Sequence, residues 1–596
     1  MDSEQQAGVA PAIIGVRLAL GLAQGAALYF LYDAYDGHSW PATDGYLFAP
    51  LLMLAVLAPL LVMQGAGNLR ALTLVLWTAV AGAIIWSLAW YDIWRWPHEF
   101  LWYGGQNEST QRLIPTFALW FFLSAGLFIA HALISGGDAD RRFMASYPTH
   151  FDVAWKLGVQ FALAFLFVGA FWLVLWLGAE LFKLIKLDFF QKLIEHRWFA
   201  IPATTLATAV ALHVSDVRAG FVRGLRTLAL VLLSWLLPLM AVIAAGFLAS
   251  LPFTGLEPLW ATRRASASLL LAAAALVVLI NAAYQDGEDE RRAAGIFAYA
   301  IRAASLLLVP IAGLAIYGIA LRVRQYGWTV ERIASAACAL VAASYAIGYA
   351  LNSFVPSRHL IERWNFVTAI LILIVLGVIF SPIADPARIA VDSQVARLES
   401  GKVKPEQFDF RYLRFHAARF GNEALQRLAA APHPQAVRKS AAAALAATSY
   451  YALPRTFVFR PLSDRLTVYP KGTILPAGFL KLSAKDDPAS AQWLACLGPS
   501  NETCDAVLSD QDGDGRPEVI VFDGSSAQVF KEQAPGQWRL RGSAFARGCS
   551  AFFDALREHR FQTARPQDPM DDIVVQGVRF HFETPGPIFG ERPCPK

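Results

Sequence analysis

The chain has 596 residues, of which 56% are hydrophobic and 16% are charged, with a formal net charge of +5. Soluble domains carry about 25% charged residues, so this composition excludes an ordinary soluble enzyme, a disordered chain and a small disulfide scaffold. The basic residues stand in short segments between apolar runs, which favours a role in membrane topology over binding of nucleic acid.

Eleven apolar runs of membrane-spanning length occupy the first 384 residues. A transmembrane helix needs about 20 mostly apolar residues to cross the hydrocarbon core. Region 1–384 is therefore predicted to be an α-helical polytopic membrane bundle, with spans at about 12–32, 46–64, 71–91, 113–134, 156–182, 198–214, 226–250, 266–284, 303–321, 333–351 and 366–384. The acidic start MDSEQQ and the span-length first run indicate an uncleaved anchor and not a signal peptide.

The loop charges give an orientation only through the first loop. If the N-terminus is cytoplasmic, the short loops on each side carry eleven Lys and Arg residues, so the overall count does not decide. Segment 33–45, however, has three acids and no Lys or Arg. Since early segments usually dominate topology, we expect a cytoplasmic N-terminus, and eleven spans then put the C-terminal region in the periplasm.

Some ionisable residues lie inside the apolar runs or at their ends. Charged or titratable groups are costly in lipid, so they are expected to face a bundle interior or a cavity. His131 and Arg302 are the candidates for such a polar interior, with structural hydrogen bonding and ion translocation as alternative roles. Glu180 and Lys183 are three residues apart on one helical face and are expected to pair.

After Pro382 the apolar runs stop. Region 385–450 shows apolar positions at helical spacing and is predicted to form a helical connector. Region 451–596 contains short strand-like runs separated by turn residues, such as TFVFRP, RLTVYP and EVIVFD. It is predicted to be a small mixed or mostly β domain, with a helix near FFDALREH.

Four of the five cysteines lie in this last region. Cys496, Cys504, Cys549 and Cys594 have no CxxC metal spacing, so they favour two disulfides in one of three connectivities, with free thiols as the alternative. Disulfides persist in the periplasm and not in a reducing cytosol. The fifth, Cys338, lies within an apolar run and is expected to be a small buried residue.

The tract SDQDGDGRPEVIVFD carries alternating acids, Asp510, Asp512 and Asp514, followed by the carbonyl of Arg516 and the side chain of Glu518. Calcium prefers six to eight oxygen ligands, which a tight acidic loop can bring together. The tract resembles the calcium loops of integrin-type and dockerin-type repeats, although only one copy is present. We expect it to bind Ca²⁺, with a solvated acidic turn as the alternative.

Four further tracts resemble one family. YPTHFDVAWK (147–156), LPFTGLEPLWATRRAS (251–266), NAAYQDG (281–287) and LRVRQYGWTVERI (321–333) are similar to the bacterial membrane-protein family known as domain of unknown function 4153. The resemblance covers roughly 140–385. It implies a multipass inner-membrane protein without an established activity, and it carries over no catalytic residue.

Common catalytic signatures are missing from the sequence. It contains no GxxxxGK[ST], GxGxxG, GxSxG or HExxH motif and no Cys/His cluster with zinc spacing. The favoured interpretation is a non-catalytic envelope protein that docks to or senses another envelope protein or a cell-wall component. A secondary transporter or channel is an alternative, because Pro59, Pro238 and Pro310 fall within spans. A second alternative is a lipid-linked-sugar glycosyltransferase using Asp33 and Asp36.

Overall fold

The architecture was analysed on a computed structural model. The chain forms two compact units, Met1–Pro405 with Phe410–Leu453, and Glu406–Asp409 with Pro454–Lys596. The structure describes residues 11–96, 98–99, 110–261, 264–285, 295–355, 360–447, 461–482, 494–497, 502–511, 513–545, 550–561, 573–575 and 578–580.

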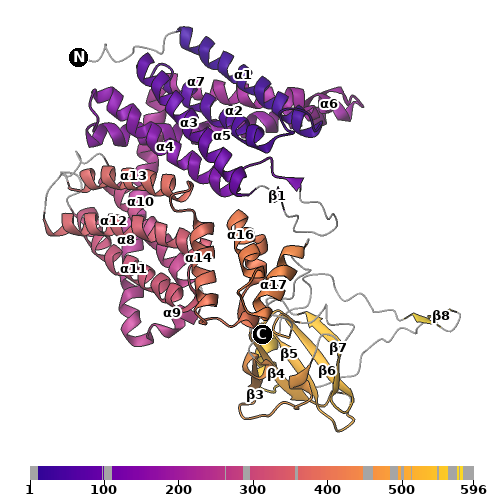
Figure 1. The fold of residues 1–596 in the computed structure, drawn as a ribbon. Helices are drawn as coiled ribbons and strands as arrows, with labels where there is room; N and C mark the ends of the chain where they lie inside the picture. Colours follow the sequence, from indigo (N-terminus) through magenta and orange to yellow (C-terminus); the bar gives the residue numbers. More distant parts are fainter. Residues whose placement is uncertain are drawn as a thin grey trace. The chain divides into compact units, whose positions relative to one another are not determined.

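Eleven long apolar helices in the described residues make up most of the first unit, which confirms the predicted polytopic bundle (Figure 1). They are α1 (Pro11–Asp36), α2 (Gly45–Gly65), α3 (Ala71–Arg95), α4 (Phe117–Asp140), α5 (Tyr147–Leu184), α7 (Arg197–Val217), α8 (Ala219–Thr254), α10 (Ala265–Tyr284), α11 (Ile296–Tyr326), α12 (Val330–Phe354) and α13 (Leu360–Ile379). Shorter elements are β1 (His98–Glu99), β2 (Thr110–Gln111), α6 (Phe189–Glu195) and α9 (Glu257–Ala261).

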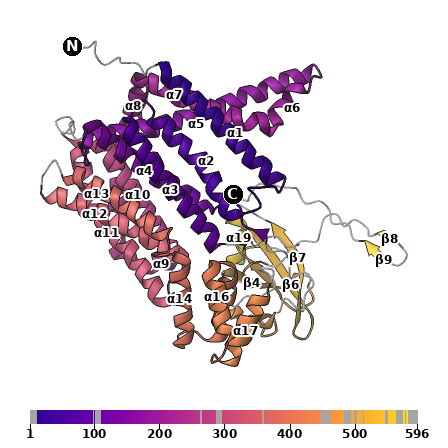
Figure 2. The same cartoon turned by 45° about the horizontal axis from the view of Figure 1, so that its top comes forward.

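The spans pack as two groups of neighbours. Helices α1–α5 and α7 contact one another in the first group, and α8 and α10–α13 form the second around a core that includes Leu276, Leu308 and Tyr349 (Figure 2). Contacts of α4 with α13 and of α5 with α8 join the groups. The helices stay continuous through internal prolines such as Pro59 and Pro310, since neighbouring helices pack around them.

Helices α1 and α7 approach each other closely because α1 carries glycines one turn apart. A Cβ atom built on Gly21 would lie 2.8 Å from the Ala209 Cβ, and one built on Gly25 would lie 2.5 Å from the Pro202 Cα. Small residues at four-residue spacing allow two membrane helices to bring their backbones together. This contact fixes the first span against the sixth.

Four more helices follow the spans within the first unit, in the region expected to form a helical connector. They are α14 (Pro386–Glu399), α15 (Phe410–Phe415), α16 (Ala418–Ala429) and α17 (Gln435–Ala446). The 3-10 turn η2 (Pro405–Gln407) lies where the chain passes from the first unit to the short segment Glu406–Asp409 of the second. Helix α14 packs against α12 and α16, and α15, α16 and α17 pack on one another. The apolar faces of these helices therefore pack within the first unit.

The GWTVER tract holds α14 in place. The Trp328 backbone N–H donates to Ser393 Oγ at 3.0 Å, and Gln394 Nε2 donates to the Trp328 carbonyl at 2.8 Å. Gly327 between α11 and α12 has φ +74°, and a Cβ there would lie 2.6 Å from the Arg397 Cδ. Both the backbone angle and the close contact require glycine at this turn.

The second unit contains a five-stranded mixed sheet in the order β3-β4-β5-β6-β7, which agrees with the predicted mixed domain. The strands are β3 (Leu466–Tyr469), β4 (Cys504–Ser509), β5 (Glu518–Phe522), β6 (Ser526–Ala534) and β7 (Gln537–Phe545). The β3–β4 pair is parallel and the other pairs are antiparallel. Other elements are α18 (Leu462–Arg465), η3 (Phe479–Lys481), α19 (Ser550–Arg557), β8 (Ile573–Val575) and β9 (Val578–Phe580).

Both faces of this sheet are covered. All five residues of the central strand β5 are buried. Phe479, Phe530 and Trp538 pack on one face, whereas Phe553 and Leu556 of α19 pack on the other. A strand covered on both faces reads as a continuous apolar run, which explains the EVIVF sequence.

Candidate functional sites

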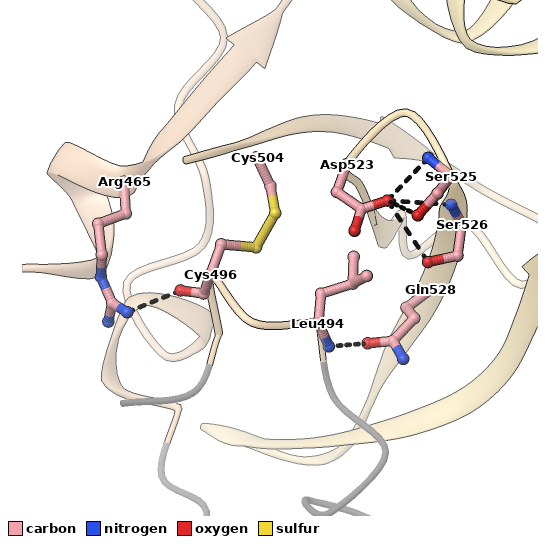
Figure 3. Close-up of a disulfide and its surroundings, with 8 residues drawn as sticks. All are labelled: Arg465, Leu494, Cys496, Cys504, Asp523, Ser525, Ser526 and Gln528. Atoms are coloured by element: carbon pink, nitrogen blue, oxygen red, sulfur yellow. Dashed lines mark hydrogen bonds between the residues drawn. A yellow bond between two sulfur atoms is a disulfide. The ribbon is translucent and has the colours of Figure 1, made fainter. Parts of the chain in front are cut away.

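One predicted disulfide is formed in the second unit. Cys496 and Cys504 are bonded, with their Cα atoms 6.0 Å apart, and both residues are buried in the core on one face of the sheet (Figure 3). The bond ties a turn at 494–497 to the start of β4, and Arg465 Nη1 donates to the Cys496 carbonyl at 2.7 Å. Cys549 and Cys594 lie outside the described residues.

The acidic tract forms the turn between β4 and β5. Asp510 accepts hydrogen bonds from the Gly513 N–H at 2.8 Å and from the Gly515 N–H at 3.0 Å, one on each carboxylate oxygen. Asp514 Oδ1 accepts from the Arg516 N–H at 2.8 Å. These bonds fold the turn on itself. Asp512 lies outside the described residues.

A lysine supplies positive charge beside this turn. Lys531 Nζ on β6 donates to Asp514 Oδ2 at 2.6 Å and lies 3.4 Å from Glu518 Oε1. Its hydrogen bond to Asp514 lowers the pKa of that carboxyl below the usual value. Among the residues that the structure describes, no group of three or more His, Cys, Asp or Glu side chains is arranged to hold a metal ion. Calcium binding by this turn stays a prediction.

Four other residues that stood out in the sequence lie on three different helices of the first unit. Asp33 and Asp36 are exposed on the last turn of α1. Arg302 does not face the interior, because its side chain is exposed near the start of α11. Cys338, expected to be buried, is instead exposed on α12. These positions bring none of the four residues into a common site.

His131 is buried on α4, and Glu180 and Lys183 lie 3.7 Å apart as an exposed pair on α5. Trp77 Nε1 on α3 donates to His131 Nδ1 at 3.0 Å. The imidazole therefore forms a structural hydrogen bond between two spans, one of the two roles expected for it.

Two buried ionic clusters were not predicted from the sequence. The first joins Arg17 and Lys156 to Asp216, and the second joins Arg95 to Asp92 and Asp385. Asp92, Arg95, Asp216 and Asp385 lie at or near helix ends, whereas Arg17 and Lys156 lie within α1 and α5. In either place, a local charge gives no signal of its partner. Asp385, for example, also accepts the Tyr91 hydroxyl at 3.0 Å and caps α14 through the Ala387 N–H at 2.7 Å.

A cavity among the spans lies where the ends of α4, α10 and α12 meet the starts of α5 and α13. It has a volume of about 820 Å³, within the range of small-molecule sites. Its walls combine apolar and polar side chains, among them Phe128, Leu133, Arg142, Tyr147, Arg363 and Phe366. The position of these helix ends puts the cavity at one face of the membrane.

A closed ring of hydrogen bonds adjoins this cavity through Asn281 and Asn365, which line it. Asn365 Nδ2 donates to Asn281 Oδ1 at 2.7 Å and to the Tyr147 hydroxyl at 3.2 Å. Asn281 Nδ2 donates to the Tyr349 hydroxyl at 2.7 Å, which in turn donates to Asn365 Oδ1 at 2.7 Å. The ring connects α5, α10, α12 and α13. Polar groups at membrane depth that satisfy one another in this way mark a candidate functional site.

Tyr147 and Asn281 lie within tracts that resemble a family, and nothing in the sequence predicts that they belong to a site. The available signal was an amide or phenol at the end of an apolar run. That signal does not reveal which helix ends converge. The cavity therefore could be recognised only once the packing of the helices was known.

A comparison with protein families finds one match, to the family described as "Domain of unknown function (DUF4153)", over residues 44–431. No curated protein and no solved structure matches the chain. The matched region includes all four tracts quoted above and the residues that line the cavity.

Proposed function

The chain belongs to the family described as domain of unknown function 4153, and from this premise we propose that it is a non-catalytic envelope protein of a bacterial inner membrane. In this proposal, the helical bundle anchors an exported C-terminal domain. The Cys496–Cys504 disulfide carries the proposal, because such bonds persist in the periplasm and are rare in the cytosol. The eleven spans found among the described residues support it, since an odd number puts the two flanking regions on opposite sides.

The exported domain is proposed to bind Ca²⁺ at the turn between β4 and β5. Asp510, Asp512, Asp514, Glu518 and the Arg516 carbonyl would supply the oxygens that a hard cation requires. Lys531 Nζ contacts both Asp514 and Glu518, so these two carboxylates already hold a cationic group. This supports the proposal that they can bind a metal cation. Binding of the ion would displace the Lys531 ammonium from these carboxylates.

The sheet edge is proposed as the docking surface. Strand β7 is nine residues long and, among the described strands, pairs only with β6. Arg539 and Arg541 are exposed on it. An edge strand presents unpaired backbone groups to an added strand, and the two cations favour an acidic one. The proposed partner is therefore an extended acidic segment of another envelope protein.

A topology reporter tests the premise of export. A fluorescent protein that matures only in the cytoplasm is fused after Lys596 of the full chain, with a fusion in the loop that follows α10 as the cytoplasmic control. The proposal expects a dark C-terminal fusion and a bright control. A bright C-terminal fusion would overturn the proposal.

Calcium binding is tested on the full chain by hydrogen exchange. Added Ca²⁺, but not Mg²⁺ at the same concentration, should slow exchange of the amides at 510–518. Asp510→Asn and Asp514→Asn should abolish that response, while the exposed Asp464→Asn in α18 should keep it. Unchanged exchange on adding Ca²⁺ to the wild-type chain would remove the calcium part of the proposal.

Complementation of a deletion strain separates docking from the transferase alternative. Arg539→Glu with Arg541→Glu should fail to restore the wild-type phenotype, whereas Asp33→Ala with Asp36→Ala should restore it. The reverse result would favour the glycosyltransferase, because exposed acids of α1 would then be required.

A further inference from the structure

We propose that the cavity between α4, α5 and α13 binds an anionic phospholipid, with the phosphate at Arg142 and Arg363 and an acyl chain between α4 and α13. This assignment does not depend on export of the C-terminal domain. It rests on the charge of the cavity rim, the apolar space that continues from it, and unpartnered polar atoms in its wall.

Two arginines line the cavity without a carboxylate of their own. Within the described part of the chain, the side chains of Arg142 and Arg363 form no ion pair and no hydrogen bond. Arg70 nearby differs, because its Nε lies 2.7 Å from Asp138 Oδ1. A guanidinium group matches the geometry of a phosphate with two parallel N–H donors. The rim thus carries two exposed arginines that form no ion pair among the described residues, beside the carboxylate of Glu362, which also lines the cavity.

A second cavity of about 440 Å³ continues from the first. It shares Leu133, Arg142 and Phe366 with the larger cavity and extends past Ile370 and Leu373 of α13. Seven residues of helix separate Phe366 from Leu373, which corresponds to about 10 Å along the axis of α13. One part of this cavity is lined by polar side chains, among them Arg70, Asp138 and Arg141. The part along Ile370 and Leu373 is apolar and suits an acyl chain below an anionic headgroup.

The loop beside the rim has the exposure expected at the membrane surface. Phe143 is 91% exposed and Met144 is 48% exposed, and both directly follow Arg141 and Arg142 between α4 and α5. Aromatic and apolar side chains next to cations are typical of the layer where headgroups meet acyl chains. A lipid phosphate at this depth lies level with Arg142.

The cavity wall also offers hydrogen-bond donors. The ring nitrogens of His150 are buried and have no hydrogen-bond partner. The imidazole lies over Gly136, where a Cβ would come within 2.5 Å of Nδ1, and it packs against Phe366 with ring centroids 5.6 Å apart. The Tyr147 hydroxyl hydrogen has only a 3.5 Å contact, to Asn281 Oδ1. A buried polar group without a partner is unfavourable, and a bound phosphate would accept a hydrogen bond from the ring N–H of His150.

The test uses the full chain in neutral detergent and measures thermal stabilisation by added phosphatidylglycerol, phosphatidylcholine or inorganic phosphate. Phosphatidylglycerol should raise the melting temperature at the lowest concentration. Equal responses to phosphatidylglycerol and phosphatidylcholine would overturn the proposal. An equal response to inorganic phosphate and phosphatidylglycerol would also overturn it, because a soluble anion would then be the ligand.

Variants locate the site. Arg142→Gln with Arg363→Gln should weaken phosphatidylglycerol binding about tenfold or more, since charge-assisted hydrogen bonds are lost. The matched control is Arg302→Gln, an exposed arginine outside both cavities. Leu373→Trp, which fills the acyl space but keeps the rim, should weaken lipid binding and leave the weak phosphate response unchanged. Wild-type affinity in both cavity variants would contradict the assignment.

Discussion

Arg17 of α1 and Asp216 of α7 form an ion pair inside the bundle, with Nη2 2.7 Å from Oδ2 and with the two side chains 1% and 3% exposed. The other carboxylate oxygen lies 2.7 Å from Lys156 Nζ of α5. Gln160 Nε2 also donates to Oδ1, at 3.3 Å. One carboxylate thus balances two cations and joins three spans.

Asp216→Asn should destabilise the bundle more than any exposed charge substitution. It would leave Arg17 and Lys156 facing each other without an anion, and removal of one partner from a buried pair costs about 3–5 kcal/mol. The measurement is unfolding in detergent micelles, followed by melting temperature. Replacing all three charged partners, as in Arg17→Met with Lys156→Met and Asp216→Leu, should recover much of the loss.

Glu180→Gln is the control for this prediction. Glu180 and Lys183 are 3.7 Å apart and both are exposed, so their pair should contribute less than about 1 kcal/mol. Equal melting temperatures for Asp216→Asn and Glu180→Gln would show that the Arg17 cluster does not stabilise the fold.

Gly25→Ala should separate α1 from α7. The new Cβ would lie 2.5 Å from the Pro202 Cα, which is backbone and cannot rotate away. Overpacking of this kind costs about 1–3 kcal/mol. On the same helix, a Cβ at Gly15 meets no atom within 4 Å, so Gly15→Ala is a matched control. A melting temperature for Gly25→Ala equal to that of Gly15→Ala would argue against direct backbone contact.

Cys496→Ala with Cys504→Ala should loosen the sheet of the second unit. The bond closes a loop with a sequence separation of 8, which corresponds to about 2–3 kcal/mol of stabilisation in the chain-entropy model. Hydrogen exchange of β3–β7 in the full chain should become faster, and a reductant should produce the same change in the wild type. Cys338→Ala, at the exposed thiol of α12, should leave exchange unchanged. Exchange unaffected by the double substitution would contradict the prediction.

The turn between β5 and β6 should lose stability in acid. Burial raises the pKa of Asp523, but the Ser525 N–H at 2.9 Å, the Ser525 hydroxyl at 2.8 Å and the Ser526 N–H at 3.0 Å outweigh it and lower the pKa below its usual value (Figure 3). Asp523 therefore stabilises the fold above its unfolded pKa of about 4, and the contribution disappears as pH falls through the folded pKa.

Asp523→Asn is the corresponding variant. It should be less stable than wild type at neutral pH, and the difference should shrink below about pH 4, measured by urea unfolding of the full chain across a pH series. Ser525→Ala removes one donor and should show a smaller difference with the same pH dependence. A difference that stays constant down to pH 2 would contradict the role of the ionised carboxylate.

Local properties of the sequence were sufficient to predict the membrane spans and the mixed-sheet fold class of the second unit. An apolar run such as 266–284 can cross lipid only as a helix, because every backbone group must then bond within its own segment. The buried run at 518–522 and its flanking turns likewise indicate a strand. Cys496 and Cys504 were recognisable as disulfide candidates, but their pairing needed the path of the chain from the turn at 494–497 to β4.

The site residues, in contrast, could not be identified from local properties of the sequence. Asp33 and Asp36 stood out as paired acids, yet they are exposed at the end of α1, while Asp216 and Asp385 gave no local signal and became centres of buried clusters. The sequence by itself determined which segments are helical, apolar and membrane-spanning, because length, hydrophobicity and backbone hydrogen bonding act within one segment. Only the tertiary structure decided that Tyr147, Asn281, Tyr349 and Asn365 meet beside a cavity with two exposed arginines, because those contacts depend on packing between helices far apart in the chain.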